Sequence, residues 1–159
     1  MEDQEISTKV AKAAKLKGFY IKGTNSFNTK DKNNDLHSIY LGQDIDESYD
    51  DYTKRLEDAF YKTGVPSFGY TAKDLFISAT QTAFAKWLRT THNIYVELNI
   101  ILSGSFAYGI YKLKEDGGIA NILFFATEQH SEKNYEKALD KAFLKALTYI
   151  KINKDESNI

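Results

Sequence analysis

Apolar and polar positions alternate most clearly in the C-terminal half of the chain. In ATQTAFAKWLRTTH, residues 79–92, apolar side chains including Trp87 recur at the spacing of one helical face. Ser78 with Gln81 has the pattern of a capping box, and Asn93 is one of the few non-glycine residues that tolerate the left-handed conformation of a helix C-terminus. The pattern predicts an amphipathic helix that ends before Asn93 and leads directly into a strand.

Three runs rich in β-branched and aromatic residues follow this helix, separated by SGS and EDGG. They are IYVELNIIL (94–102), FAYGIYKLK (106–114) and IANILFFAT (119–127). Strands joined by such short links pair antiparallel, and a sheet of three strands has two unpaired edges. The first run has only Glu97 as a charged guard, so a homo-oligomer formed through this strand edge is one expectation.

The strongest helical periodicity of the chain lies in its last predicted helix, which starts at a Ser131 cap and runs to about Lys151. Its apolar positions are Tyr135, Ala138, Leu139, Ala142, Phe143, Ala146, Leu147 and Ile150. The order α–β–β–β–α predicts a three-stranded antiparallel sheet with both helices packed on one face. Trp87 is then expected to be part of the core between the first of these helices and the sheet, and not part of a ligand site.

The N-terminal pattern is less regular. Residues 7–17 predict a short helix that Ser7 caps. FYIKG (19–23) and LHSIYLG (36–42) predict the two strands of a hairpin, joined by the polar segment 24–35.

A second N-terminal helix is predicted over 49–62, and Gly64 and Pro66 end it. The segment 71–77 is compatible with the start of the following helix or with a lead into it.

The whole pattern predicts an α+β protein with an N-terminal subdomain over 1–70, an αβββα subdomain over 71–151 and a flexible tail over 152–159.

Composition narrows the classes of function. The 159 residues carry a net charge of −1 and include no cysteine, which excludes disulfides, thiolate metal sites and cysteine nucleophiles. The charge is mixed along the chain, and the basic excess typical of nonspecific nucleic-acid binding is absent. The start MEDQEISTKV is unlike a signal peptide, and no apolar stretch approaches the roughly 18–20 residues that span a bilayer. We expect a cytoplasmic protein with no membrane partner.

The patterns of catalytic and metal sites are absent from the sequence. The acidic run DIDESYDD suggests calcium, but an EF-hand loop that begins at Asp44 would have Tyr49 in place of glycine and Arg55 in place of the bidentate glutamate. DKNND, which begins at Asp31, fails in the same way. The three histidines lack the spacing of metal ligands, and no phosphate loop, catalytic triad order or carboxylate pair is recognisable. The sequence predicts neither catalytic residues, nor a cofactor, nor a metal, and favours a protein that is not an enzyme.

Four lysines repeat every fourth position on the last helix and form one row. They are Lys133, Lys137, Lys141 and Lys145. The neighbouring row is acidic, which favours a solvated face held by side-chain pairs of about 0.2–0.5 kcal/mol each. The alternative is a nucleic-acid-binding row, because the αβββα order matches that of double-stranded-RNA-binding domains.

Tyrosines are the candidates for binding a protein partner, because tyrosine is enriched in interface cores. The N-terminal half provides Tyr40, Tyr49 and Tyr52, followed by Tyr61 and Tyr70. The alternative is that these rings fill the core of the N-terminal subdomain.

Two blocks of the chain resemble a group of small uncharacterised proteins from Bacteroidales genomes, prophages and phages. The blocks are ATQTAFAKWLRTTHNIYVE and YEKALDKAFLKALTYI, which match a TQ…KWLR..HNI block and a closing YE.AL…AL..I helix. AAKLKGF near the N-terminus fits the same group, whereas residues 24–70 do not match it. The resemblance implies an origin in a phage or a gut bacterium and carries no activity.

EDGGIANILFF followed by YEKALDKAFLKAL is also similar, over this turn and helix alone, to antitoxins of the HicB type. The sequence therefore leads us to expect a non-enzymatic phage or prophage accessory protein that binds another macromolecule, with a protein as the first candidate. The alternatives are a nucleic-acid-binding or antitoxin-like regulator that uses the last helix, and a structural component of the virion.

Overall fold

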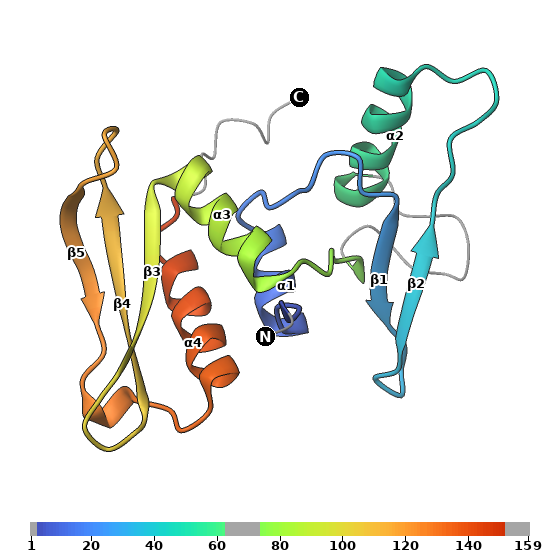
Figure 1. Ribbon diagram of the computed structural model, residues 1–159. Coiled ribbons are helices and arrows are strands. Elements are labelled where there is room, and N and C mark those ends of the chain that lie inside the picture. Colours follow the sequence, from blue (N-terminus) through green and yellow to red (C-terminus); the bar gives the residue numbers. More distant parts are fainter. Residues whose placement is uncertain (1–2, 63–73, 152–159) are drawn as a thin grey trace. The chain divides into compact units, whose positions relative to one another are not determined.

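The computed structural model in Figure 1 describes residues 3–62 and 74–151, and it confirms the α+β class. Gly64 and Pro66, which the sequence predicts to end the helix over 49–62, and the tail predicted over 152–159 lie outside the described residues. The chain divides into two compact units, one made of Met1–Lys17 with Ala79–Ile159 and the other of Gly18–Ser78. Each unit is described by itself.

The first unit joins the two ends of the chain. Its elements are α1 (Thr8–Lys15), α3 (Gln81–His92), β3 (Ile94–Ile100), β4 (Phe106–Leu113), β5 (Ile119–Phe125), the 3-10 turn η2 (Glu128–His130) and α4 (Tyr135–Leu147). The strands form one antiparallel sheet in the order β3–β4–β5, as predicted. The helices α3 and α4 pack on one face of this sheet (Figure 1).

The core of this unit lies between the helices and the sheet. Phe84 of α3 and Phe143 of α4 meet edge to face, with ring centroids 4.9 Å apart, and Ile110 of β4 is fully buried. Leu88 is fully buried, whereas Trp87 is half-buried and stacks on Phe84 with ring centroids 5.4 Å apart. Trp87 therefore closes the margin of this core.

The division of the chain differs from the predicted boundary after residue 70, because α1 packs against α4. Val10 and Ala14 of α1 are fully buried, and the Lys17 ammonium donates a 2.8 Å hydrogen bond to the Ile150 carbonyl. The helix α1 thus buries its apolar stripe in the same unit as the C-terminal helices.

Two helices begin later than their predicted caps, because the residues before them form backbone hydrogen bonds with distant segments. The cap of α3 is Thr80 and not Ser78, because backbone hydrogen bonds to Gln4 and Ile6 hold residues 79–81 against the N-terminal segment, and the Thr80 hydroxyl accepts the Ala83 N–H.

The cap of α4 is Asn134 and not Ser131, because Glu132 exchanges two backbone hydrogen bonds with Phe106 and is held extended. The helix α4 also ends at Leu147, before the predicted Lys151. The Ser7 cap of α1 is confirmed: its hydroxyl accepts the Val10 N–H.

The second unit comprises β1 (Ser26–Lys30), β2 (Leu36–Tyr40) and α2 (Tyr49–Tyr61). The hairpin predicted with its first strand at 19–23 is formed by 26–30. Asn28 also exchanges two backbone hydrogen bonds with Phe76, so β1 has partners on both sides. The Asp31 carboxylate accepts the N–H groups of Asn33 and Asp35 and sets the register of the tight turn.

Aromatic rings fill the core of the second unit. Phe27 and Phe60 are fully buried and stack with centroids 5.2 Å apart, and Phe19 and Phe76 are also buried. The segment 75–77, which the sequence left ambiguous, is buried and extended within this unit.

The left-handed residue between α3 and β3 gives a direct stability test. Asn93 has φ 52° and ψ 38°, and its N–H bonds to the Leu88 and Arg89 carbonyls. We expect Asn93→Val to lower the free energy of unfolding by about 1–2 kcal/mol and Asn93→Gly to change it by a few tenths, because only valine is strained in this conformation. Urea denaturation measures both variants. Thr91→Val, at an exposed helical position, is the control, and an Asn93→Val variant as stable as this control would contradict the expectation.

Candidate functional site

The sheet of the first unit has one face that none of the unit's described helices covers. Side chains alternate along a strand, and the register places every second residue of β3 and β4 on this open face. We call the following set the open-face patch: Tyr95, Glu97, Asn99, Tyr111, Ile119, Ile122 and Phe125.

A fixed aromatic ring lies at the centre of the open-face patch. Tyr111 lies over Gly109, where a Cβ atom would run into the ring, and its hydroxyl donates a 3.2 Å hydrogen bond to Glu97. The Asn99 amide donates to the same carboxylate oxygen at 3.4 Å. Burial, and then the hydrogen bond to Glu97, raise the pKa of Tyr111. The ring, only 8% exposed, is therefore held in one position.

The β5 side of the patch is apolar and exposed. Ile122 is 67% exposed, Phe125 is 56% exposed, and Ile119 is similarly open. Glu97 is the only charged strand residue on this face, because Lys112 of β4 belongs to the opposite one. A contiguous apolar surface with a polar centre is typical of an interaction site.

The structure brings two of the four predicted lysines into contacts within the first unit. Lys141 forms an ion pair with Glu132, whose pKa it lowers through a side-chain hydrogen bond. The Lys145 ammonium lies 4.9 Å from the centre of the Phe124 ring and 5.8 Å from that of Tyr149. These contacts support the interpretation that the lysine row of α4 lies on a solvated face and is held by contacts between side chains.

The predicted tyrosines separate into surface and core. Tyr40 is 69% exposed and Tyr49 is also exposed, but Tyr52 is only 7% exposed and donates its hydroxyl to the Leu41 carbonyl at 3.0 Å. Tyr52 is thus a core residue of the second unit, as the alternative interpretation held. Tyr61 bonds the Phe19 carbonyl, and Tyr70 lies outside the described residues.

Sequence reasoning missed the open-face patch because β3, β4 and β5 carry apolar residues on both faces. Strict alternation would have placed Tyr95 with Tyr111 on one side, but it could not indicate which side the helices cover.

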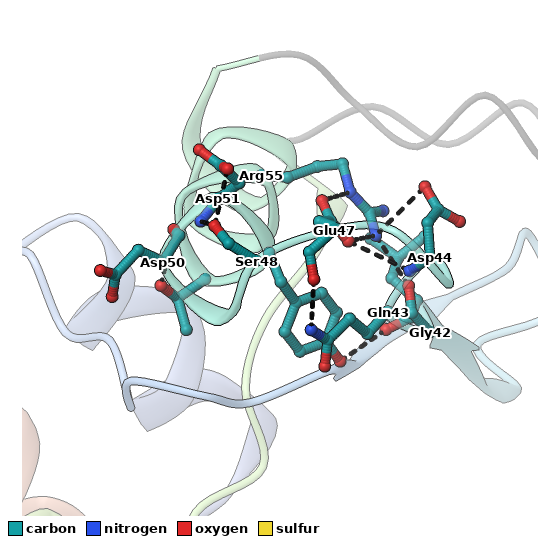
Figure 2. Close-up of polar contacts among 11 residues, drawn as sticks. Gly42, Gln43, Asp44, Glu47, Ser48, Asp50, Asp51 and Arg55 are labelled. Carbon is teal, nitrogen blue, oxygen red and sulfur yellow. Dashed lines mark hydrogen bonds and ion pairs between the residues drawn. The ribbon is translucent and has the colours of Figure 1, made fainter.

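Figure 2 shows that an arginine of α2 engages the acidic run before this helix. The Arg55 guanidinium bonds both carboxylate oxygens of Glu47, at 2.7 and 2.8 Å, and the Gly42 carbonyl at 2.7 Å, and it lies 3.9 Å from Asp44. The Ser48 hydroxyl caps α2 at Asp51. The positive group that balances these carboxylates is part of the protein itself.

The three histidines do not converge within either unit. His37 pairs with Asp31 at 3.1 Å and His130 with the Thr127 hydroxyl at 3.1 Å, while the His92 ring packs edge-on against Trp87. Among the described residues, no group of three or more histidine, cysteine or acidic side chains could hold a metal ion.

His92 lines a hollow of about 270 Å³ at the C-terminal ends of α3 and α4, together with Lys112 and Tyr149. Its Nε2 atom is buried and has no hydrogen-bond partner among the described residues. Burial, and then the charge of Lys112, lower the pKa of His92.

Comparisons with known proteins leave the function to be argued from this geometry. A scan against protein-family models, a search of curated proteins and a search of solved structures each gave no match. Across the described parts of the chain, no helix is long and apolar enough to cross a membrane.

The contacts of Arg55 predict that the thermal stability of the protein depends on the planar guanidinium group, which bonds both carboxylate oxygens of Glu47. Arg55 lowers the pKa of Glu47 below its usual 4.5, so the pair stabilises the fold above that value and loses its effect as the pH falls through the lower folded pKa. We expect Arg55→Lys and Arg55→Gln both to lower the Tm at pH 7, because neither makes the two-pronged contact. Lys54→Gln, an exposed neighbour, should leave the Tm unchanged, and a calcium-induced rise in the wild-type Tm would contradict the assignment.

His92 predicts a pH dependence at milder acidity. Because its pKa in the folded protein lies below the usual 6.5, the unfolded chain takes up a proton first, and the stability should fall as the pH drops through 6.5 towards the folded value. His92→Phe should remove this part of the slope. Urea denaturation at a series of pH values measures it. His130→Phe is the control and should keep the wild-type slope, so equal slopes for the wild type and His92→Phe would refute the prediction.

Proposed function

We propose that this chain is a non-enzymatic phage or prophage accessory protein that acts by binding another protein through the open-face patch. The observation that carries the proposal is the exposure of Ile122 and Phe125 beside the fixed ring of Tyr111. Burying an isoleucine or phenylalanine side chain contributes about 1.5–3 kcal/mol, and a ring that is already fixed loses little further entropy on binding.

The charge of the patch points to protein and not to nucleic acid. Its single charged group is the Glu97 carboxylate, which would repel phosphates, and no lysine or arginine of the three strands belongs to this face. The Glu97 carboxylate accepts from Tyr111 and Asn99 and has lone-pair positions left for a donor on a partner. The matching partner surface is apolar, with a hydrogen-bond donor opposite Glu97.

Affinity capture tests this proposal. Immobilised protein is incubated with Bacteroidales lysate, with and without phage infection, and bound proteins are quantified by mass spectrometry. Ile122→Lys should reduce capture of the specific partner about tenfold or more, because a charge is placed in the apolar part of the patch. Leu36→Lys introduces the same charge at an exposed apolar position of β2 and should retain the partner.

Two outcomes would contradict the proposal. Either no protein is enriched over a control resin, or Ile122→Lys retains what the wild type captures. Duplex RNA binding that weakens with salt and is lost in Lys133→Ala with Lys137→Ala would instead favour the competing proposal, a nucleic-acid-binding regulator that uses α4.

A further inference from the structure

The two edges of the β3–β4–β5 sheet differ in regularity. All seven residues of β3 pair with β4 without a register shift. The pairing of β5 with β4 shifts twice, between Ile110 and Tyr111 and between Lys112 and Leu113. Bulges twist an edge away from further pairing, so the edge of β5 is protected and that of β3 remains regular.

The hydrogen bonds at the ends of the β3–β4 ladder show which backbone groups of β3 face outwards. Ile101 N–H bonds the Ser105 carbonyl, and Leu113 N–H bonds the Asn93 carbonyl. In an antiparallel ladder these bonds alternate, so the odd-numbered residues of β3 bond β4 and the even-numbered ones point their N–H and C=O groups away from it. The outward residues are Ile94, Val96, Leu98 and Ile100.

The helix-facing side of the β3 edge is hollowed. Val96 and Leu98 line a hollow of about 320 Å³, together with Ala85 of α3 and with Leu139 and Phe143 of α4. The contact region between strand edge and helices is therefore incompletely filled at the middle of β3. Asp3, Gln4, Gln81 and Thr82 also line the hollow, so it is apolar along β3 and α4 and polar towards the start of α3.

An exposed apolar side chain lies on the same strand. Ile100 is 74% exposed, and it shares the helix-facing side of β3 with Val96 and Leu98. Together these features give β3 three properties: a row of outward backbone groups without a partner among the described residues, a hollow beside Val96 and Leu98, and an apolar projection at Ile100.

We infer that β3 pairs antiparallel with β3 of a second copy of this chain, about a two-fold axis at Leu98. Two-fold symmetry lets one strand present the same row of donors and acceptors to itself. In this register Val96 lies opposite Ile100 of the partner subunit, whose side chain then enters the hollow beside Val96 and Leu98.

Charge favours the register with the axis at Leu98 over the register shifted by one residue, with the axis at Glu97. With the axis at Leu98, the Glu97 carboxylate lies opposite Asn99 of the partner subunit, which can donate to it. With the axis at Glu97, the two carboxylates would face each other, and like charges directly opposite are destabilising. The dimer has a six-stranded sheet with β5 at both outer edges, and the apolar part of the open-face patch on β5, namely Ile119, Ile122 and Phe125, is not needed for pairing.

Light scattering and sedimentation at micromolar concentration test the dimer. The wild type should have twice the 18.1 kDa mass of the chain, and Ile100→Lys should be a monomer, because the charge would have to be buried against Val96 and Leu98. Ile100 is exposed in the single chain, so the variant should fold, and circular dichroism verifies this. Ile122→Lys makes the same change on β5 and should remain dimeric.

The pairs of variants separate this inference from the proposed function. Ile100→Lys should lose the dimer, whereas Ile122→Lys should lose partner capture. A monomeric wild type, or a dimer that Ile100→Lys leaves intact, would overturn the inference whatever the capture experiment gives.

A single introduced cysteine tests the register. Paired Cα atoms of hydrogen-bonded residues lie about 5.5 Å apart, within the range that a disulfide bridges. Because the chain has no cysteine, Leu98→Cys should form a disulfide-linked dimer under mild oxidation, and Ile122→Cys should not. Absence of the Leu98→Cys cross-link, or an equal cross-link through Ile122→Cys, would overturn the axis at Leu98.

Discussion

The packing of two helices against a three-stranded sheet is the constraint on which the structure of the first unit depends. A sheet of three strands has two faces, and among the described elements α3 and α4 cover one of them (Figure 1). The covered face meets Phe84 and Phe143, and the other face keeps Tyr111, Ile122 and Phe125. The open-face patch thus lies on the face that the described helices of this unit leave uncovered.

Long-range pairing of short segments completes this unit. Residues 4–6 bond residues 79–81, the Ser7 N–H reaches Asp140 at 3.4 Å, and Lys17 bonds the Ile150 carbonyl. The second unit is therefore inserted in sequence between two parts of the first. Contacts over such sequence separations carry a loop-closure cost before they stabilise anything, which favours slow assembly of the first unit.

Much of the charge that suggests binding in the sequence is balanced inside the protein. Arg55 engages the acidic run, Lys141 engages Glu132, and Lys145 covers the Phe124 ring. Charge patterns along a chain do not indicate which partner each group finds, because the partner can be distant in sequence. The open-face patch, by contrast, has Glu97 as its single charged strand residue.

The sequence by itself determined the α+β class, the three antiparallel strands and the Ser7 and Asn93 helix ends, because these depend on short-range periodicity and local backbone preference. Only the tertiary structure decided the Thr80 and Asn134 caps and the position of β1, because backbone pairing with distant segments overrode a local signal of similar strength. It also decided which face of the sheet is open. The strands are apolar on both sides, so the choice depended on where α3 and α4 pack, and packing is a property of the folded chain.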